Sequence, residues 1–107
     1  MTAGGKLDFG SVGWADDQSD IRSRAAAALG SRWAVVEYGP HAARDEWCVD
    51  GHRGYVLAGH IEYEFDDGSD TLAIDEGHGF FLAAGTGHRG RNPRETVTRL
   101  FLIDDPS

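Results

Sequence analysis

The chain has 107 residues, of which 18 are Asp or Glu and 10 are Lys or Arg, so its formal net charge is −8. Because nucleic acids and anionic membrane surfaces bind basic faces, this charge predicts that neither is a partner. Hydrophobic residues make up 40% of the chain, enough for the core of one small domain, and none of their runs approaches the length that spans a bilayer. The single cysteine, Cys48, cannot form an internal disulfide, and the N-terminal residues lack the basic and apolar regions of a signal peptide, so we expect a cytoplasmic protein.

The first segments of the chain allow more than one assignment. Residues 1–20 are rich in Gly, Ser and Asp, and we expect them to form a loosely ordered lead-in to a single barrel domain over residues 21–107. Residues 21–29 contain four consecutive alanines, which favour a helix that Asp20 could cap. The same residues also fit an alternating edge strand that turns at Gly30 into the next strand. We prefer the strand, because the remainder of the chain has the pattern of an all-β protein.

Further along the chain, glycines separate short runs that are β-branched, aromatic or alternating. In the run HIEYEF, Ile61, Tyr63 and Phe65 would face the core, and His60 would lie on the solvent side. The pattern predicts an all-β barrel or sandwich. The predicted strands are residues 32–38, 44–48, 54–58, 60–65, 71–74, 79–83 and 96–103.

Residues 77–92 (GHGFFLAAGTGHRGRN) combine an apolar strand with a tight glycine turn that presents a histidine and, four residues later, an asparagine. This stretch resembles the second conserved motif of the cupin superfamily, G-x5-P-x-G-x2-H-x3-N. Ala83 stands in place of the motif's proline. The resemblance covers about residues 32–103 and implies a cupin-type double-stranded β-helix, which is a jelly-roll barrel. The other motif positions hold Gly77, Gly85, His88 and Asn92.

The first cupin motif, G-x5-H-x-H-x3/4-E-x6-G, is degenerate in this chain. Gly59 fits its closing glycine, which places His52 at the position of the motif's glutamate. The His-x-His pair then falls on Glu46 and Cys48, or on Asp45 and Trp47 with the longer spacing. If the barrel closes as in cupins, a set of metal ligands would converge near its centre: Glu46, Cys48, His52 and His88.

One carboxylate and two imidazoles, with an optional thiolate, suit a divalent first-row transition metal. Without the thiolate the set favours iron(II), with Cys48 bound it favours zinc, and nickel and manganese stay open. The alternatives are a buried, non-ligating Cys48 and a solvated Glu46. Arg89 and its neighbours Arg91 and Arg94 could bind an anionic substrate. The residues expected to line the pocket are Trp47, Tyr55, Phe81 and Arg89.

Two functions follow from the resemblance and the predicted ligands. The first is a barrel that binds one divalent metal and acts on a small organic molecule, with oxygenase, isomerase and lyase chemistry all open. The second is a metal-free module that binds a sugar, metabolite or effector, which the loss of the His-x-His pair favours. Cupins commonly pair through N-terminal strands, so the resemblance also implies a homodimer, with the alanine run 25–28 as a contact.

Overall fold

The computed structural model of the protein describes residues 3–105. Over this range the chain forms nine strands and one short 3-10 turn, η1, at Phe9–Ser11, and contains no helix long and apolar enough to cross a membrane. The strands are β1 (Ala15–Gln18), β2 (Ile21–Ala28), β3 (Ser31–Tyr38), β4 (His52–Ala58), β5 (His60–Phe65), β6 (Leu72–Asp75), β7 (Gly79–Leu82), β8 (His88–Arg91) and β9 (Thr98–Asp104).

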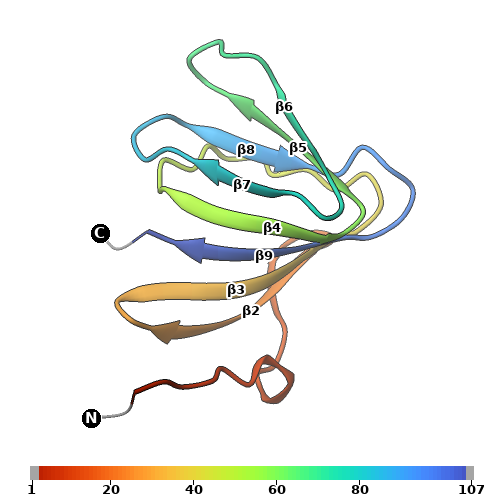
Figure 1. Ribbon diagram of the computed structural model, residues 1–107. Helices are drawn as coiled ribbons and strands as arrows, with labels where there is room; N and C mark the ends of the chain where they lie inside the picture. Colours follow the sequence, from red (N-terminus) through yellow and green to blue (C-terminus); the bar gives the residue numbers. More distant parts are fainter. Residues whose placement is uncertain (1–2, 106–107) are drawn as a thin grey trace.

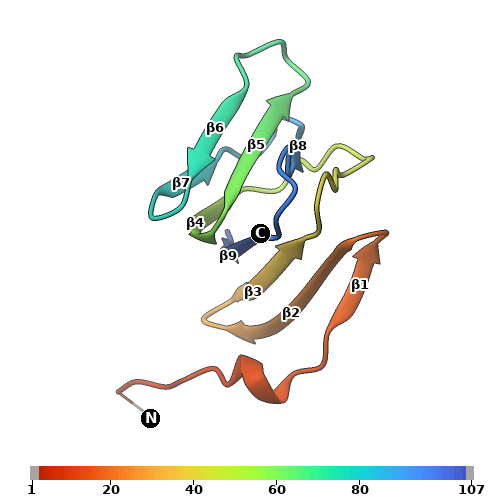
Figure 2. The same ribbon diagram turned by 90° about the vertical axis from the view of Figure 1, so that its right-hand side faces the viewer.

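These strands form two antiparallel sheets that face each other (Figures 1 and 2). The large sheet has the order β1-β2-β3-β9-β4-β7, and the small sheet has the order β6-β5-β8. Neighbours such as β3 and β9 are far apart in sequence, as a jelly roll requires. The prediction of an all-β jelly-roll barrel is therefore confirmed.

Residues 21–28 form β2, so the strand interpretation of this segment is confirmed and the helix is wrong. All eight residues of β2 pair with β3, and this long ladder outweighs the helix propensity of the alanines. Strand β1 lies within the predicted lead-in and pairs with β2, so the sheet begins at Ala15 rather than at residue 21. The lead-in is also held by Trp14, whose ring lies 4.1 and 4.0 Å from the guanidinium carbons of Arg22 and Arg24.

The core lies between the two sheets and is made by alternate residues of their strands. In β3 these are Ala34, Val36 and Tyr38, and Val36 lies opposite Leu100 of β9. The small sheet contributes Ile61 and Tyr63 among others. The remaining buried apolar residues are Ile21, Ala42, Val56, Ile74, Leu82 and Leu102.

His60, which we expected on the surface, is 7% exposed. Its backbone N–H donates to Thr98 Oγ1 at 3.1 Å, and the Thr98 hydroxyl donates to the His60 carbonyl at 2.7 Å, so the start of β9 covers it. Its ring nitrogens lie 2.7 Å from Asp75 Oδ1 and 3.2 Å from Glu62 Oε2. The alternation of HIEYEF was predicted correctly, but the contact with β9 could not be predicted from this strand alone.

Substituting Glu37 with glutamine is expected to lower the free energy of unfolding by about 1–3 kcal/mol at neutral pH. Glu37 is 6% exposed and lies between Arg22 of β2 and Arg99 of β9, whose Nε atoms donate to it at 2.9 and 2.8 Å. Burial alone would raise the pKa of the Glu37 carboxyl, but hydrogen bonds from Arg99 and Arg22 hold it below its usual value of 4.5.

The contribution of Glu37 is therefore complete above its unfolded pKa and disappears as the pH falls through the lower pKa of the folded state. Urea unfolding of both proteins across the acidic range should show their difference shrinking toward low pH. Glu95→Gln, at an exposed carboxylate, is the matched control and should change little. A difference that stays constant with pH would contradict the assignment.

Candidate metal centre

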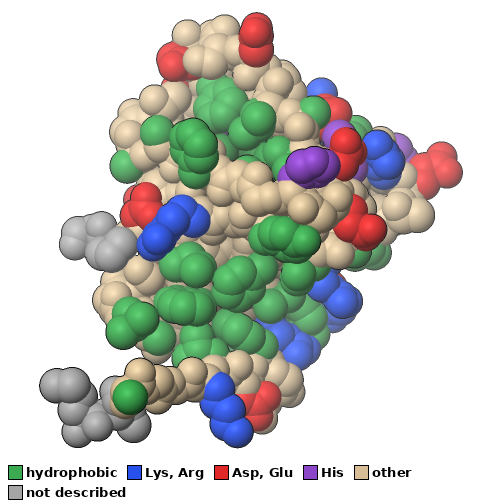
Figure 3. Space-filling view, in the orientation of Figure 1, with side chains coloured by type: hydrophobic (Ala, Val, Ile, Leu, Met, Phe, Trp, Pro, Cys, Tyr) green, Lys and Arg blue, Asp and Glu red, His purple; other side chains and the backbone are tan. Residues whose placement is uncertain are grey.

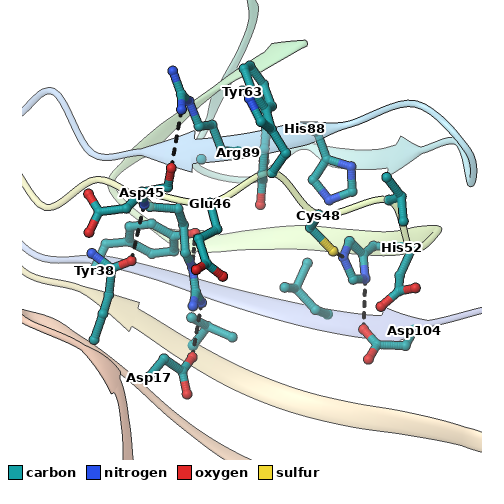
Figure 4. A pocket seen from close by; sticks show the side chains of 18 of the residues that line it. Asp17, Tyr38, Asp45, Glu46, Cys48, His52, Tyr63, His88, Arg89 and Asp104 are labelled. Atoms are coloured by element: carbon teal, nitrogen blue, oxygen red, sulfur yellow. Dashed lines mark hydrogen bonds and ion pairs between the residues drawn. The ribbon is translucent and has the colours of Figure 1, made fainter. Parts of the chain in front are cut away.

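Three side chains with metal-binding atoms meet inside the barrel, and they come from the two segments that resemble cupin motifs. Cys48 lies in the loop before β4, His52 begins β4 and His88 begins β8. One ligand atom from each lies within 4.8 Å of the other two. Backbone hydrogen bonds of 2.8 Å in both directions join Cys48 to His88, and the two imidazole rings are 5.0 Å apart between centroids. Figure 4 shows the three side chains pointing toward one another.

A carboxylate from the last strand orients one of the imidazoles. Asp104 Oδ1 lies 2.7 Å from His52 Nδ1, and its negative charge favours the proton on Nδ1. The other ring nitrogen, Nε2, is then free to bind a cation, and it lies 3.6 Å from Cys48 Sγ. Asp104 and His52 occupy opposite positions in the ladder between β9 and β4, so the sheet register brings them together.

The second imidazole has an unsatisfied nitrogen. His88 is 3% exposed, and among residues 3–105 its buried Nδ1 forms no hydrogen bond of good geometry, although the ring lies near the Thr86 backbone. Burial, and secondarily the nearby His52, lower the pKa of His88, which keeps the ring neutral and able to bind a metal. Native proteins rarely leave a buried ring nitrogen unpaired, so this atom suggests a missing ligand.

Of the four predicted metal ligands, the structure brings together Cys48, His52 and His88 but not Glu46. Glu46 is exposed, and Figure 4 shows its carboxylate away from the three side chains, at the border of the same pocket. Motif spacing placed Glu46 and Cys48 in the predicted strand 44–48, where residues two apart would face the same way. In the structure this segment is a loop with an isolated bridge at Cys48, so the alternation does not apply.

The cluster opens into a pocket of about 810 Å³. Two of the residues expected to line it do so: Trp47 and Arg89, whose guanidinium carbon lies 4.1 Å from the Trp47 ring centroid. The other two, Tyr55 and Phe81, lie on the outer face of the large sheet and are 44% and 76% exposed. Since His52 faces inward and residues alternate along β4, Tyr55 faces outward.

The arginines around His88 do not offer free positive charge. Arg89 is ion-paired with Glu64, Arg91 with Glu62 at 2.9 Å, and Arg94 approaches Asp75 at 3.8 Å. The expectation that they bind an anionic substrate therefore loses its support.

Asp104, Tyr38 and Tyr63 are among the pocket residues that the sequence interpretation missed. Asp104 lies just beyond the predicted strand 96–103, but β9 extends to it, and the alternation of residues 98–104 places it on the same face as Leu100 and Leu102. Burial raises the pKa of Tyr38 and raises that of Tyr63 well above its usual value, so both phenols are protonated at neutral pH.

No family model and no curated protein matches this chain. Solved structures do match it over nearly its whole length. An RmlC-like cupin from Shewanella frigidimarina NCIMB 400 is 15% identical with a TM-score of 0.77, and the match covers 100% of this chain and 96% of that chain. KdgF from Halomonas sp. is 18% identical with a TM-score of 0.74, and the match covers 98% and 96% of the two chains. The chain has the cupin fold.

The same fold recurs within larger proteins. Oxalate decarboxylase from Bacillus subtilis is 16% identical with a TM-score of 0.82, and the match covers 99% of this chain but 30% of that chain. At these identities the likeness establishes the fold and leaves the function to be argued from the site. The resemblance of residues 77–92 to a cupin motif thus predicted the fold correctly, and His88 of that motif lies inside the cupin barrel.

Proposed function

We propose that Cys48, His52 and His88 bind one divalent transition-metal ion, and that the protein uses it to bind or transform a small organic molecule. The observation that carries the proposal is the convergence of three ligand atoms within 4.8 Å around a buried imidazole with an unpaired nitrogen. One thiolate and two imidazoles suit zinc best, and iron(II) and nickel also accept such ligands. Bound there, the metal would supply a Lewis acid that polarises a ligand oxygen or lowers the pKa of water.

The chain's own residues would prepare this site. Asp104 holds His52 with Nε2 available, burial keeps His88 neutral, and three protein ligands leave a coordination position for a substrate. The pocket of about 810 Å³ beside them has room for a small organic molecule. A reducing cytoplasm, which we propose as the location, would keep Cys48 available as a thiolate ligand.

The test is metal loading of the purified protein after chelation and dialysis. Elemental analysis should find about one metal per chain after incubation with zinc, iron(II), nickel or manganese. An ion present at a hundredfold excess over its Kd should stabilise the fold by about 2.7 kcal/mol. Absence of bound metal together with an unchanged melting temperature for all four ions would overturn the proposal.

The second candidate is a metal-free module that binds a metabolite in the same pocket. It is favoured by the position of Glu46, which leaves three ligands and no carboxylate in the cluster. This candidate requires that neither a chelator nor added metal changes the melting temperature of the wild-type protein or of the variants His52→Ala and His88→Ala. The metal proposal requires that metal raises the melting temperature of the wild-type protein alone.

We also propose a homodimer, formed through the outer face of the large sheet. Apolar side chains gather over β9 and β3 in Figure 3. The ladder aligns Trp33 with Ile103 and Val35 with Phe101, and Tyr55 and Phe81 continue the face across β4 and β7. Large exposed apolar patches are uncommon on monomers. The alanine run is a weaker candidate, since Ala25 packs against the core.

Light scattering after gel filtration should therefore report twice the chain mass. Phe81→Glu, which places a charge on a side chain that is 76% exposed, should shift the mass toward that of the monomer without loss of the fold. Asp67→Lys in the exposed turn before β6 is the control and should leave the dimer intact. A wild-type protein that is monomeric at every concentration would remove the proposal.

A further inference from the structure

Two phenol groups lie on the wall of the pocket that holds the three candidate ligands (Figure 4). Tyr38 ends β3 and Tyr63 lies in β5, and each is 3% exposed. They converge over Gly90 of β8: a Cβ at Gly90 would lie 2.9 Å from Tyr38 Oη and 2.9 Å from Tyr63 Cε1. Residues from three strands of both sheets therefore bring these two side chains together.

Both phenols retain a proton that no group in the described part of the chain accepts. Tyr38 Oη accepts a hydrogen bond from Arg44 Nε at 3.1 Å, and Arg44 in turn donates to Asp17 at 3.0 Å. Within residues 3–105 the Tyr38 O–H donates to no acceptor and Tyr63 Oη forms no hydrogen bond, and Tyr63 Oη is not among the unpaired atoms that are sealed from solvent, so it is open to the pocket. A phenol is both donor and acceptor, so each of these hydroxyls has a proton to donate to a molecule in the pocket.

One of the two phenol rings packs against the candidate metal centre, and both side chains line the same pocket. The Tyr63 ring is 5.9 Å from the His88 ring between centroids, at an interplanar angle of 82°. Arg44 lies behind Tyr38, with its guanidinium carbon 5.4 Å from the ring centroid. Its positive charge strengthens the Tyr38 O–H as a donor, as in a short hydrogen-bonded chain. A hydrogen-bond acceptor on a molecule in the pocket would satisfy both phenols.

We propose that Tyr38 and Tyr63 together bind a carbonyl or carboxylate oxygen of the small molecule that occupies this pocket. The inference rests on the proposed small-molecule site, but the two donors do not depend on the metal. The inference gives the orientation of the ligand in the pocket. One end would lie at Cys48, His52 and His88, and an acceptor oxygen would lie at the two phenols. Two donors that reach the same oxygen would stabilise negative charge developing on it.

The test uses NMR of protein labelled at tyrosine Cζ. The chain has three tyrosines, and the third, Tyr55, lies on the outer face and serves as an internal control. Benzamide and benzoate, which present acceptor oxygens, are expected to shift the Tyr38 and Tyr63 signals and leave Tyr55 in place. Benzylammonium has the same ring and only donors, so it should shift neither. Tyr38→Phe and Tyr63→Phe should each weaken benzamide binding about tenfold, and Tyr55→Phe should not change it.

Titrations of the metal-free and the zinc-loaded protein separate this inference from the proposed function. Shifts confined to Tyr38 and Tyr63 in a protein that never binds zinc would uphold the tyrosine site and overturn the metal. If the protein binds zinc but neither benzamide nor benzoate shifts its tyrosine signals, the tyrosine site is overturned and the metal site is upheld. Equal affinity of the wild-type protein and both phenylalanine variants would also overturn the tyrosine site.

Discussion

Replacement of His88 by alanine is expected to weaken zinc binding at least about a hundredfold. Structural zinc sites with four ligands gain roughly 10–16 kcal/mol, or roughly 3 kcal/mol per ligand, which corresponds to roughly a hundredfold in Kd. His88 is one of only three ligands that converge within the described part of the chain, so no neighbouring group replaces it. Competition with a chromogenic chelator measures the Kd, and cobalt(II) substitution adds a thiolate-to-metal absorption band that reports Cys48.

The matched control is His78→Ala, since His78 is exposed and lies outside the cluster. This variant should bind zinc as the wild-type protein does. Cys48→Ser should keep weak binding by the two imidazoles but lose the cobalt–thiolate band. Zinc should also protect Cys48 of the wild-type protein from iodoacetamide. If His88→Ala and His78→Ala bind zinc equally well, the cluster is not the metal site.

The fold was predictable where local patterns and tertiary contacts agree. The alternation of residues 60–65 and the apolar run 32–38 correspond to β5 and β3 within a residue at each end. Residues 44–48 were predicted as a strand and form a loop with an isolated bridge at Cys48. Conversely, β8 was not among the predicted strands, because its residues HRGR have no apolar alternation. It exists as a strand through its pairing with β5.

Motif spacing predicted part of the candidate site. The spacing of the two motifs located Cys48, His52 and His88, even though the residue types of the first motif have changed. Spacing could not determine where Glu46 points, because a loop has no fixed side-chain period. It also could not reveal Asp104, whose position opposite His52 depends on the register between β9 and β4. The outward orientation of Tyr55 follows from its alternation with His52 along β4, which begins two residues before the predicted strand 54–58.

Asp104 is expected to determine how strongly His52 binds metal, although it does not belong to the cluster itself. Its Oδ1 lies 2.7 Å from His52 Nδ1, and outer carboxylates of this kind fix the tautomer and raise the basicity of the liganding nitrogen. Asp104→Asn should therefore weaken zinc binding about 10- to 100-fold. The Kd is measured by chelator competition, and the tautomer of His52 in the metal-free protein by imidazole nitrogen NMR.

The neighbouring residue supplies a control that carries the same change in charge. Asp105 pairs with Arg53 at 3.1 Å, on the exposed side of β4, so Asp105→Asn alters the net charge without touching His52. If the loss of negative charge near the barrel mouth were the cause, the two variants would weaken zinc binding equally. If Asp104 acts through His52, only Asp104→Asn changes the Kd and the His52 tautomer, and Asp104→Glu restores part of both. Equal behaviour of the two asparagine variants would show that Asp104 does not position this ligand.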